Sequence, residues 1–240
     1  MKIAIHQPHY FPWLGYFDKM KKVDKFVLLD QVQFEKGSQM IRNRVLDNNG
    51  CIKYLTISAD TKNYLSKPYN DISTKDNEIW TVRQLNALEN YYKKADYYGE
   101  VFPIIQDFLS TDFKTVCECT IGSIQLVCEL LEIKTSIVYQ SDVSYNRDMK
   151  KSDLVFSICD SLGADVYYSG KGASVNYLNR DCFAEHNINI VFQEFKHPEY
   201  GQINSQKFVA GLSILDVLFN CGINGAKAFL GDLYDTGAMI

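Results

Sequence analysis

The sequence predicts an α/β fold, with a mostly parallel, Rossmann-like sheet that opens with a βαβ unit and is interrupted by a β-hairpin and a helical insertion. Two observations predict this class. Strand-type apolar runs alternate with helical patterns at both ends of the chain, and such alternation is typical of parallel sheets with right-handed crossovers. The chain also has no internal repeat, low-complexity tract or flexible linker, so we expect one domain over residues 1–240.

The opening βαβ unit follows from the apolar pattern of residues 3–34. Residues 2–6 (KIAIH) form a β-branched apolar run that ends at prolines, and prolines do not continue a central strand. Residues 15–24 carry apolar side chains three and four positions apart, as on one face of a helix. Residues 25–34 (KFVLLDQVQF) then predict a second strand.

The middle of the chain departs from this alternation. Asn-Asn-Gly at 48–50 lies between two β-type segments, which favours an antiparallel hairpin. From 72 to 131 the apolar residues recur at helical spacing, and we expect two or three helices there as an insertion or cap.

The alternation resumes in the last third of the chain. Strands are predicted near 135–140, 165–169 and 188–195, and we expect them to join the same sheet as the first two. Residues 208–221 then predict an apolar helix that ends just before Gly222.

Composition limits the partners and the compartment. The 25 Lys and Arg residues nearly balance 29 Asp and Glu residues, for a net charge of −4, so nucleic acid is not expected as the main partner. The seven cysteines form no CxxC motif and no even framework, which indicates reduced thiols and a cytoplasmic protein. No signal-peptide pattern and no run of bilayer length is present, so no membrane partner is expected.

Candidate site residues stand where predicted strands end, because ligands of parallel α/β sheets bind beyond the carboxyl ends of the strands. His6 ends the first strand, within the aromatic segment 5–17, where Pro8 and Pro12 fix the backbone. It is a candidate general base, since imidazole titrates near neutrality, and the alternative is a structural histidine bonded to backbone. The other residues at such positions are Asp30, Gln33, Ser141, Asp142, Ser169, Gly170, Lys171 and His197.

A metal site and a phosphate loop are weaker interpretations. His6 and His9 could start a metal site with His197, but no cysteine or carboxylate stands at ligand spacing beside them, so we predict no metal. The glycines of residues 169–172 (SGKG) could cradle an anion, although they match neither GxxxxGK[ST] nor GxGxxG and a tight turn is equally compatible.

Two charged features remain in the predicted strands and helices. Arg42 and Arg44 share one strand face and could grip a phosphate or carboxylate, whereas Asn43 takes the other face. Asp216 stands alone in the apolar C-terminal helix, and we expect it to cap or hydrogen-bond within the structure.

Six segments resemble, in order and spacing, the blocks of the WbqC-like protein family: IHQPHYFPWLGYFDK, FVLLDQVQFEKG, RNRV, YYSGKGASVNYL, FKHPEYGQ and LSILDVLFNCG. They cover nearly the whole chain, to about residue 222. Family members are commonly encoded among bacterial O-antigen and other surface-polysaccharide genes. The resemblance implies transfer of an acyl or aminoacyl group, glycyl in particular, to an amino sugar. His9 departs from the pattern, which often has asparagine there.

The resemblance carries over to individual positions of this chain. These are His6, Gln7, Pro8, Tyr10, Pro12, Trp13, Gly15, Asp30, Gln33, Asn43, Arg44, Ser169, Gly170, Tyr177, His197, Pro198, Tyr200 and Gln202.

Three functional hypotheses follow. In the first, a transferase acts on a nucleotide-linked amino sugar, with His6 as general base and His197 as a second catalytic candidate. Tyr10 and Trp13 would stack on sugar or base, and Arg44 would hold the diphosphate. Backbone amides near Gly170 would stabilise an oxyanion.

The second hypothesis is a HIGH-like nucleotidyltransferase or ATP-dependent ligase. It rests on the histidine-bearing loop after the first strand, although the glycine and second histidine of the HIGH signature are missing. The third is a non-catalytic sugar- or nucleotide-binding protein. The sequence leaves the cofactors and the donor group unidentified.

Overall fold

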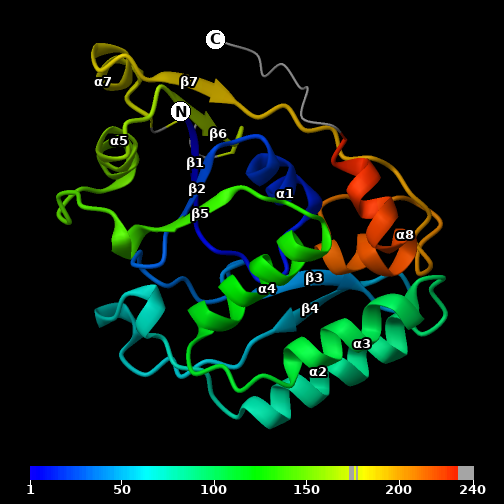
Figure 1. Ribbon diagram of the computed structural model, residues 1–240. Helices are drawn as coiled ribbons and strands as arrows, with labels where there is room; N and C mark the ends of the chain where they lie inside the picture. The colour runs from blue at the N-terminus through cyan, green and yellow to red at the C-terminus, as the bar shows by residue number, and fades with distance from the viewer. Residues whose placement is uncertain (173–175, 177, 232–240) are drawn as a thin grey trace.

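The computed structural model of the chain describes residues 1–172, 176 and 178–231 (Figure 1). Over these residues a parallel sheet forms the centre of the fold, with strand order β5-β2-β1-β6-β7. The strands are β1 (Lys2–His6), β2 (Lys25–Leu28), β5 (Ser136–Tyr139), β6 (Val166–Ser169) and β7 (Asn189–Phe192). The opening βαβ unit and the shared sheet of the predicted strands are therefore confirmed.

The strand order reverses direction at β1. The chain adds β2 and then β5 on one side of β1, returns, and adds β6 and then β7 on the other side. Parallel sheets of this kind open a crevice at the carboxyl ends of the strands where the order reverses, because successive crossovers leave to opposite sides. In this protein the crevice lies beyond His6 and Ser169, the last residues of β1 and β6.

Helices cover both faces of the sheet (Figure 1). Side chains of β1 alternate between the two layers, with Ala4 in one apolar cluster and Ile3 and Ile5 in the other. The layer around Ile3 and Ile5 is completed by α5 (Lys151–Ser161) and α7 (Arg180–Glu185). The layer around Ala4 is completed by α1 (Leu14–Lys21), α4 (Val116–Leu130) and α8 (Ile214–Phe229).

The chain between β2 and β5 holds the expected hairpin and helices. Strands β3 (Arg42–Leu46) and β4 (Ile52–Thr56) pair antiparallel around Asn-Asn-Gly, where Gly50 takes a positive φ of 73° that glycine tolerates. Helices α2 (Asn77–Tyr92) and α3 (Tyr98–Leu109) pack against each other, with α2 on β4 and α3 on α8. Short 3₁₀ helices are η1 (Tyr64–Ser66), η2 (Tyr69–Asp71) and η3 (Gln140–Asp142).

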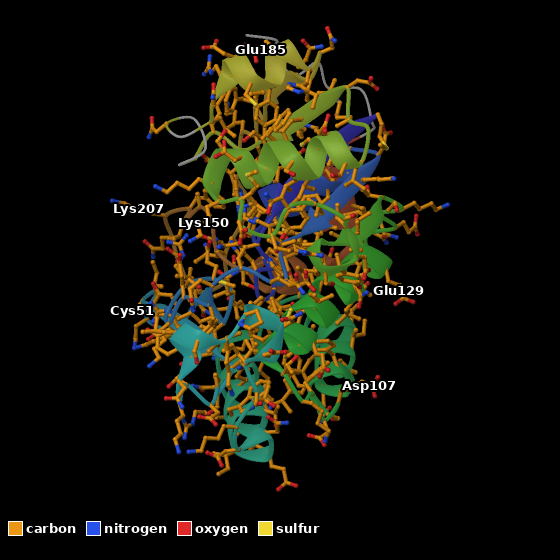
Figure 2. The ribbon with its side chains drawn as sticks, turned by 90° about the vertical axis from the view of Figure 1, so that its left-hand side faces the viewer. Cys51, Asp107, Glu129, Lys150, Glu185 and Lys207 are labelled. Atoms are coloured by element: carbon orange, nitrogen blue, oxygen red, sulfur yellow. The ribbon has the colours of Figure 1, made fainter. Side chains whose placement is uncertain are left out.

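Helix α7 and the inserted helices α2 and α3 lie at opposite ends of the molecule (Figure 1). Figure 2 shows Glu185 of α7 at one end and Asp107 of α3 toward the other, both pointing outward. The capping box of α4, in which Thr115 and Glu118 bond to each other's backbone, fixes the start of the helix that runs between these ends.

Three boundaries differ from the sequence prediction. Strand β2 ends at Leu28 and β7 at Phe192, because their neighbours β5 and β6 also end there and leave no further ladder. Gly222 does not end the last helix: it forms a kink with φ 71°, and helical structure continues to Phe229. A Cβ at Gly222 would lie 2.5 Å from the ring of Tyr97, so the close approach of α3 also requires glycine.

Candidate functional site

A hollow opens at the point where the strand order reverses. It consists of two adjoining parts of about 600 and 540 Å³ that share His6, Lys19, Gly170 and Gly172 in their walls, and we call them together the switch-point cavity. The cavity is therefore bounded by the end of β1, the turn after β6 and helix α1. Gln7 and Ser169 line one part, and Trp13 and Gln193 line the other.

His6 is held as a neutral imidazole at the wall of this cavity. Its Nδ1 lies 2.9 Å from the carbonyl oxygen of Gln7, which can only accept, so Nδ1 carries the hydrogen and Nε2 keeps its lone pair. The pKa of His6 is lowered well below its ordinary value, first by burial and then by electrostatic interaction with Lys19 and His9. A neutral ring with a free lone pair can act as a general base.

Lys19 is a residue of the cavity that the sequence prediction missed. Its side chain lines both parts of the cavity, is 4% exposed, and lies with Nζ 5.6 Å from the centre of the Phe26 ring. Burial lowers the pKa of Lys19 from 10.5 to about 7. Helical spacing could have identified Lys19, because it lies three residues after Tyr16 and four before Val23, on the apolar face of α1.

Trp13 forms another wall and depends on Gly15. Its ring folds over the first turn of α1, where a Cβ on Gly15 would lie 2.2 Å from ring atom Cη2. His197 stacks on Trp13 with ring centres 6.1 Å apart and an interplanar angle of 22°, and Phe195 meets it edge-on at 5.3 Å. His197 thus supports Trp13, and it is not among the residues that line the cavity.

The aromatic segment after β1 is fixed by distant side chains. Phe11 has a positive φ of 38°, and its carbonyl oxygen accepts hydrogen bonds from Asn43 Nδ2 and Ser213 Oγ, both at 2.8 Å. Its backbone N–H donates to Ser123 Oγ at 3.0 Å. Tyr10 is fully buried and its hydroxyl donates to Gln84. Tyr10 and Asn43 therefore hold the segment from behind and are not in position to contact a ligand in the cavity.

The two arginines of β3 lie beside a neighbouring hollow of about 500 Å³, which Gln7 and His9 also line. Arg44 donates to the carbonyl oxygen of Gly211 at 2.6 Å, and Arg42 donates to that of Gly37 at 2.7 Å. The shared face predicted for Arg42 and Arg44 is observed, but Arg44 is not part of the switch-point cavity.

Asp216 forms the centre of a hydrogen-bond network, as expected for a carboxylate in an apolar helix. Its carboxylate accepts from Tyr92 at 2.7 Å, Tyr200 at 2.7 Å and Gln202 at 2.9 Å. Burial raises the pKa of Asp216. Tyr200 and Gln202 are therefore engaged in joining α2, α8 and the segment after β7, and the structure does not bring them to the cavity.

The remaining candidates lie elsewhere. Asp30 accepts a hydrogen bond from the backbone N–H of Ser141 at 2.9 Å and so links the ends of β2 and β5. Gln33 is exposed and donates to the carbonyl oxygen of Tyr64 at 3.1 Å. Tyr177 lies outside the described residues. Of the residues predicted from the sequence, the structure brings together at the cavity His6, Gln7, Trp13, Gly15, Ser169, Gly170 and Lys171.

The charges around the cavity are mostly positive, although the chain as a whole carries a net charge of −4. Glu194 is paired with Lys171 at 2.6 Å, which leaves the other basic side chains of the wall in excess. The charged residues that line the cavity are Lys19, Lys151, Lys171, Lys196, Glu35 and Glu194. Such a wall favours a ligand that carries negative charge.

Another hollow, of about 720 Å³, lies between the turn of the hairpin, the end of α2 and the segment around Asn204. Its wall contains four asparagines but no histidine, serine or cysteine. Asn204 is bonded to the carbonyl oxygens of Leu46 and Tyr91, so it serves to hold the hairpin. The switch-point cavity is therefore the better candidate for chemistry.

The described residues contain neither a metal-binding cluster nor a membrane-spanning helix. Among the described residues, no group of three or more His, Cys, Asp and Glu side chains is placed to hold a metal ion. The rings of His6 and His9 meet edge to face with centres 4.6 Å apart. Across residues 1–172, 176 and 178–231, no helix has the length and apolar character to span a membrane.

Comparison with known proteins identifies one family. The model of the WbqC-like protein family matches residues 7–228. An uncharacterized protein of Mycobacterium tuberculosis, Rv1507c, is 28% identical over 226 residues, which cover 92% of this chain and 94% of that protein. No solved structure matches the chain.

Proposed function

Because the chain belongs to the WbqC-like protein family, we propose that it is a transferase of bacterial surface-polysaccharide (O-antigen) biosynthesis. It transfers an acyl or aminoacyl group, such as glycyl, to the amino group of a nucleotide-linked sugar. The observation that carries the proposal is His6, a buried imidazole whose Nδ1 lies 2.9 Å from the Gln7 carbonyl oxygen, in the wall of a cavity where the strand order reverses.

The chemistry assigned to His6 is proton removal during attack by the amine. The sugar nitrogen forms a bond to the carbonyl carbon of the donor, and the proton that this nitrogen loses passes to His6 Nε2. Collapse of the tetrahedral intermediate breaks the bond to the leaving group, which takes the proton from His6. Backbone amides near Gly170 stabilise the oxyanion, and Trp13 stacks on the sugar or base.

The setting proposed for this reaction is the cytoplasm. All seven cysteines are free thiols, as expected in a reducing compartment. The size of the cavity supports a small-molecule ligand, since its parts of about 600 and 540 Å³ lie in the range usual for such sites.

The test is turnover by a His6→Ala variant. UDP-glucosamine is supplied as acceptor with a panel of acyl-coenzyme A and activated glycyl donors, and the amide product is measured by mass spectrometry. We expect the variant to lose activity by about two to four powers of ten, the usual contribution of a general base. His186→Ala is the matched control, because His186 is exposed at the end of α7 and lies outside the cavity.

Thermal unfolding of the same preparations distinguishes a catalytic from a structural histidine. Full activity in a destabilised His6→Ala protein would remove the catalytic assignment. Release of AMP or pyrophosphate from ATP during the assay would instead indicate the nucleotidyltransferase or ligase. Ligand binding without turnover of any donor would indicate a sugar- or nucleotide-binding protein.

A further inference from the structure

Lys19 is a buried lysine with no carboxylate partner among residues 1–172, 176 and 178–231. Its side chain is 4% exposed, and within the described part of the chain it forms no ion pair. Lys22, one turn later on α1, shows the alternative, since it pairs with Asp18 at 3.0 Å. Burial of an ammonium group costs free energy unless an opposite charge lies beside it, so an anion bound beside Lys19 would be stabilising.

Two carboxylates in the neighbourhood of Lys19 are already engaged. Asp18, the sequence neighbour of Lys19, accepts from Gln193 at 2.6 Å in addition to its pair with Lys22. Glu194, beyond β7, is paired with Lys171, beyond β6. Neither carboxylate contributes to the charge state of Lys19, whose pKa is lowered by burial alone.

The other titratable groups that face Lys19 add no negative charge close by. His6 of β1 and His9 of the following segment interact with Lys19, and its positive charge lowers the pKa of both. Across the cavity, α5 contributes Lys151 and the segment after β2 contributes the exposed Glu35. A negative group that enters the cavity therefore meets Lys19 as a buried cation that forms no ion pair with another described residue.

We propose that Lys19 is the receptor for the diphosphate of the nucleotide-linked sugar, and that binding of this anion brings a proton to the Lys19 amine. The inference rests on the proposed function only in taking a nucleotide sugar as the ligand. It transfers to Lys19 the role expected of Arg44, which donates to the Gly211 carbonyl and lies beside the neighbouring hollow.

The pH dependence of binding follows from this assignment. In the empty site the pKa of Lys19 is about 7, so about half of the molecules carry the charge at pH 7. A bound anion favours the ammonium and raises this pKa, so binding takes up protons. Above pH 7 the affinity falls, by up to about tenfold per pH unit, because the protonated form becomes scarce.

The experiment measures proton uptake by titration calorimetry at pH 7 in two buffers of different ionisation enthalpy. The probes are UDP-N-acetylglucosamine and sulfate, whose own charges do not change near neutral pH. Wild-type protein should take up about half a proton per bound anion. Lys19→Met should take up none and bind about 10- to 100-fold more weakly, as for loss of a charged hydrogen-bond donor.

Lys21→Met is the matched control, because it removes the same charge from the same helix but lies outside the cavity wall. It should behave as wild type toward both probes. The neutral compounds uridine and N-acetylglucosamine should bind wild type and Lys19→Met alike.

A second measurement needs no variant. NMR titration of ¹³C-labelled lysine in the wild-type protein should show one lysine that titrates near pH 7, and saturating sulfate should move this midpoint upward. The inference is overturned if neither probe produces Lys19-dependent proton uptake, or if no lysine midpoint moves.

Failure of this inference is separable from failure of the proposed function. Calorimetry contains no acyl donor and requires no turnover. Proton-linked binding without amide formation would support the anion site and contradict the transferase assignment. His6-dependent transfer without Lys19-linked proton uptake would support the transferase assignment and contradict the anion site.

Discussion

At the scale of single residues, the segment around the cavity contains buried polar groups that lack a hydrogen-bond or ion-pair partner among the described residues. A purely structural segment avoids such groups. His9 is buried with its Nδ1 unpartnered, and burial lowers its pKa to about 3. Lys19 lies beside it without an ion pair among the described residues. Unsatisfied groups of this kind collect at functional sites, since their cost is tolerated only where a ligand or reaction uses them.

Replacement of Lys19 by methionine is expected to stabilise the free protein. The folded pKa of about 7 lies below the ordinary value of 10.5, so the charged lysine disfavours folding at all pH values below 7, and this cost disappears as the pH rises from 7 to 10.5. We expect Lys19→Met to raise the free energy of unfolding at pH 7 by about 2–4 kcal/mol.

Urea denaturation at pH 7 and pH 10 measures this effect. The gain should shrink at pH 10, and Lys21→Met should change stability by less than about 0.5 kcal/mol, as for an ordinary surface substitution. A Lys19→Met protein less stable than wild type at pH 7 would show that the ammonium has a favourable partner.

At the scale of secondary-structure elements, the hairpin and two helices serve to hold the segment that follows β1. Asn43 on β3, Ser123 on α4 and Ser213 at the start of α8 all bond to Phe11. Ser213 also caps α8 through the Leu215 N–H. The positive φ of Phe11 therefore depends on three elements that are remote in sequence.

Loss of the Asn43 side chain is expected to loosen this segment. Asn43→Ala removes donors to the carbonyl oxygens of Tyr10 and Phe11 and leaves both without this partner in a buried place. We expect a loss of about 2–4 kcal/mol in the free energy of unfolding and faster amide hydrogen exchange at Phe11.

The control for this prediction is Asn48→Ala, which alters the exposed turn of the same hairpin and should cost less than about 0.5 kcal/mol. Hydrogen exchange at Phe11 that is unchanged in Asn43→Ala would show that Ser123 and Ser213 hold the segment without Asn43.

At the scale of the whole molecule, the titratable groups of the site and those of the core have opposite effects on stability as the pH rises. The pKa of His9 is lowered from 6.5 to about 3 and that of Lys19 from 10.5 to about 7, so at each of these two residues the unfolded chain binds more protons than the folded protein between the two values. Burial raises the pKa of Cys128 and of Cys159 to about 12, which makes the folded state bind more protons above pH 9.

The expected result is a free energy of unfolding that rises from about pH 4 to about pH 9 and falls beyond it. Each of His9 and Lys19 contributes a slope of up to about 1.4 kcal/mol per pH unit within its own window. Thermal unfolding across this range measures the profile, and the double variant His9→Asn with Lys19→Met should flatten its rising limb. An optimum at pH 5 to 6 in wild type would contradict the assigned pKa directions.

The sequence by itself determined the class of the fold and the position of one site residue, His6. Alternating strand and helix patterns specify a parallel α/β sheet because apolar periodicity is a local property, and Asn-Asn-Gly specifies the hairpin because its backbone conformations favour a tight turn. His6 could be placed at the end of a strand for the same reason.

Only the tertiary structure decided which strand ends share a crevice, because the order β5-β2-β1-β6-β7 arises from packing between distant segments. It directed Tyr10, Asn43, Tyr200 and Gln202 into hydrogen bonds within the protein. It also brought Lys19 to the cavity. The spacing places that lysine on the apolar face of α1. Whether its amine contacts solvent, a carboxylate or an open cavity depends on which other elements pack against α1, and a local sequence pattern does not show this.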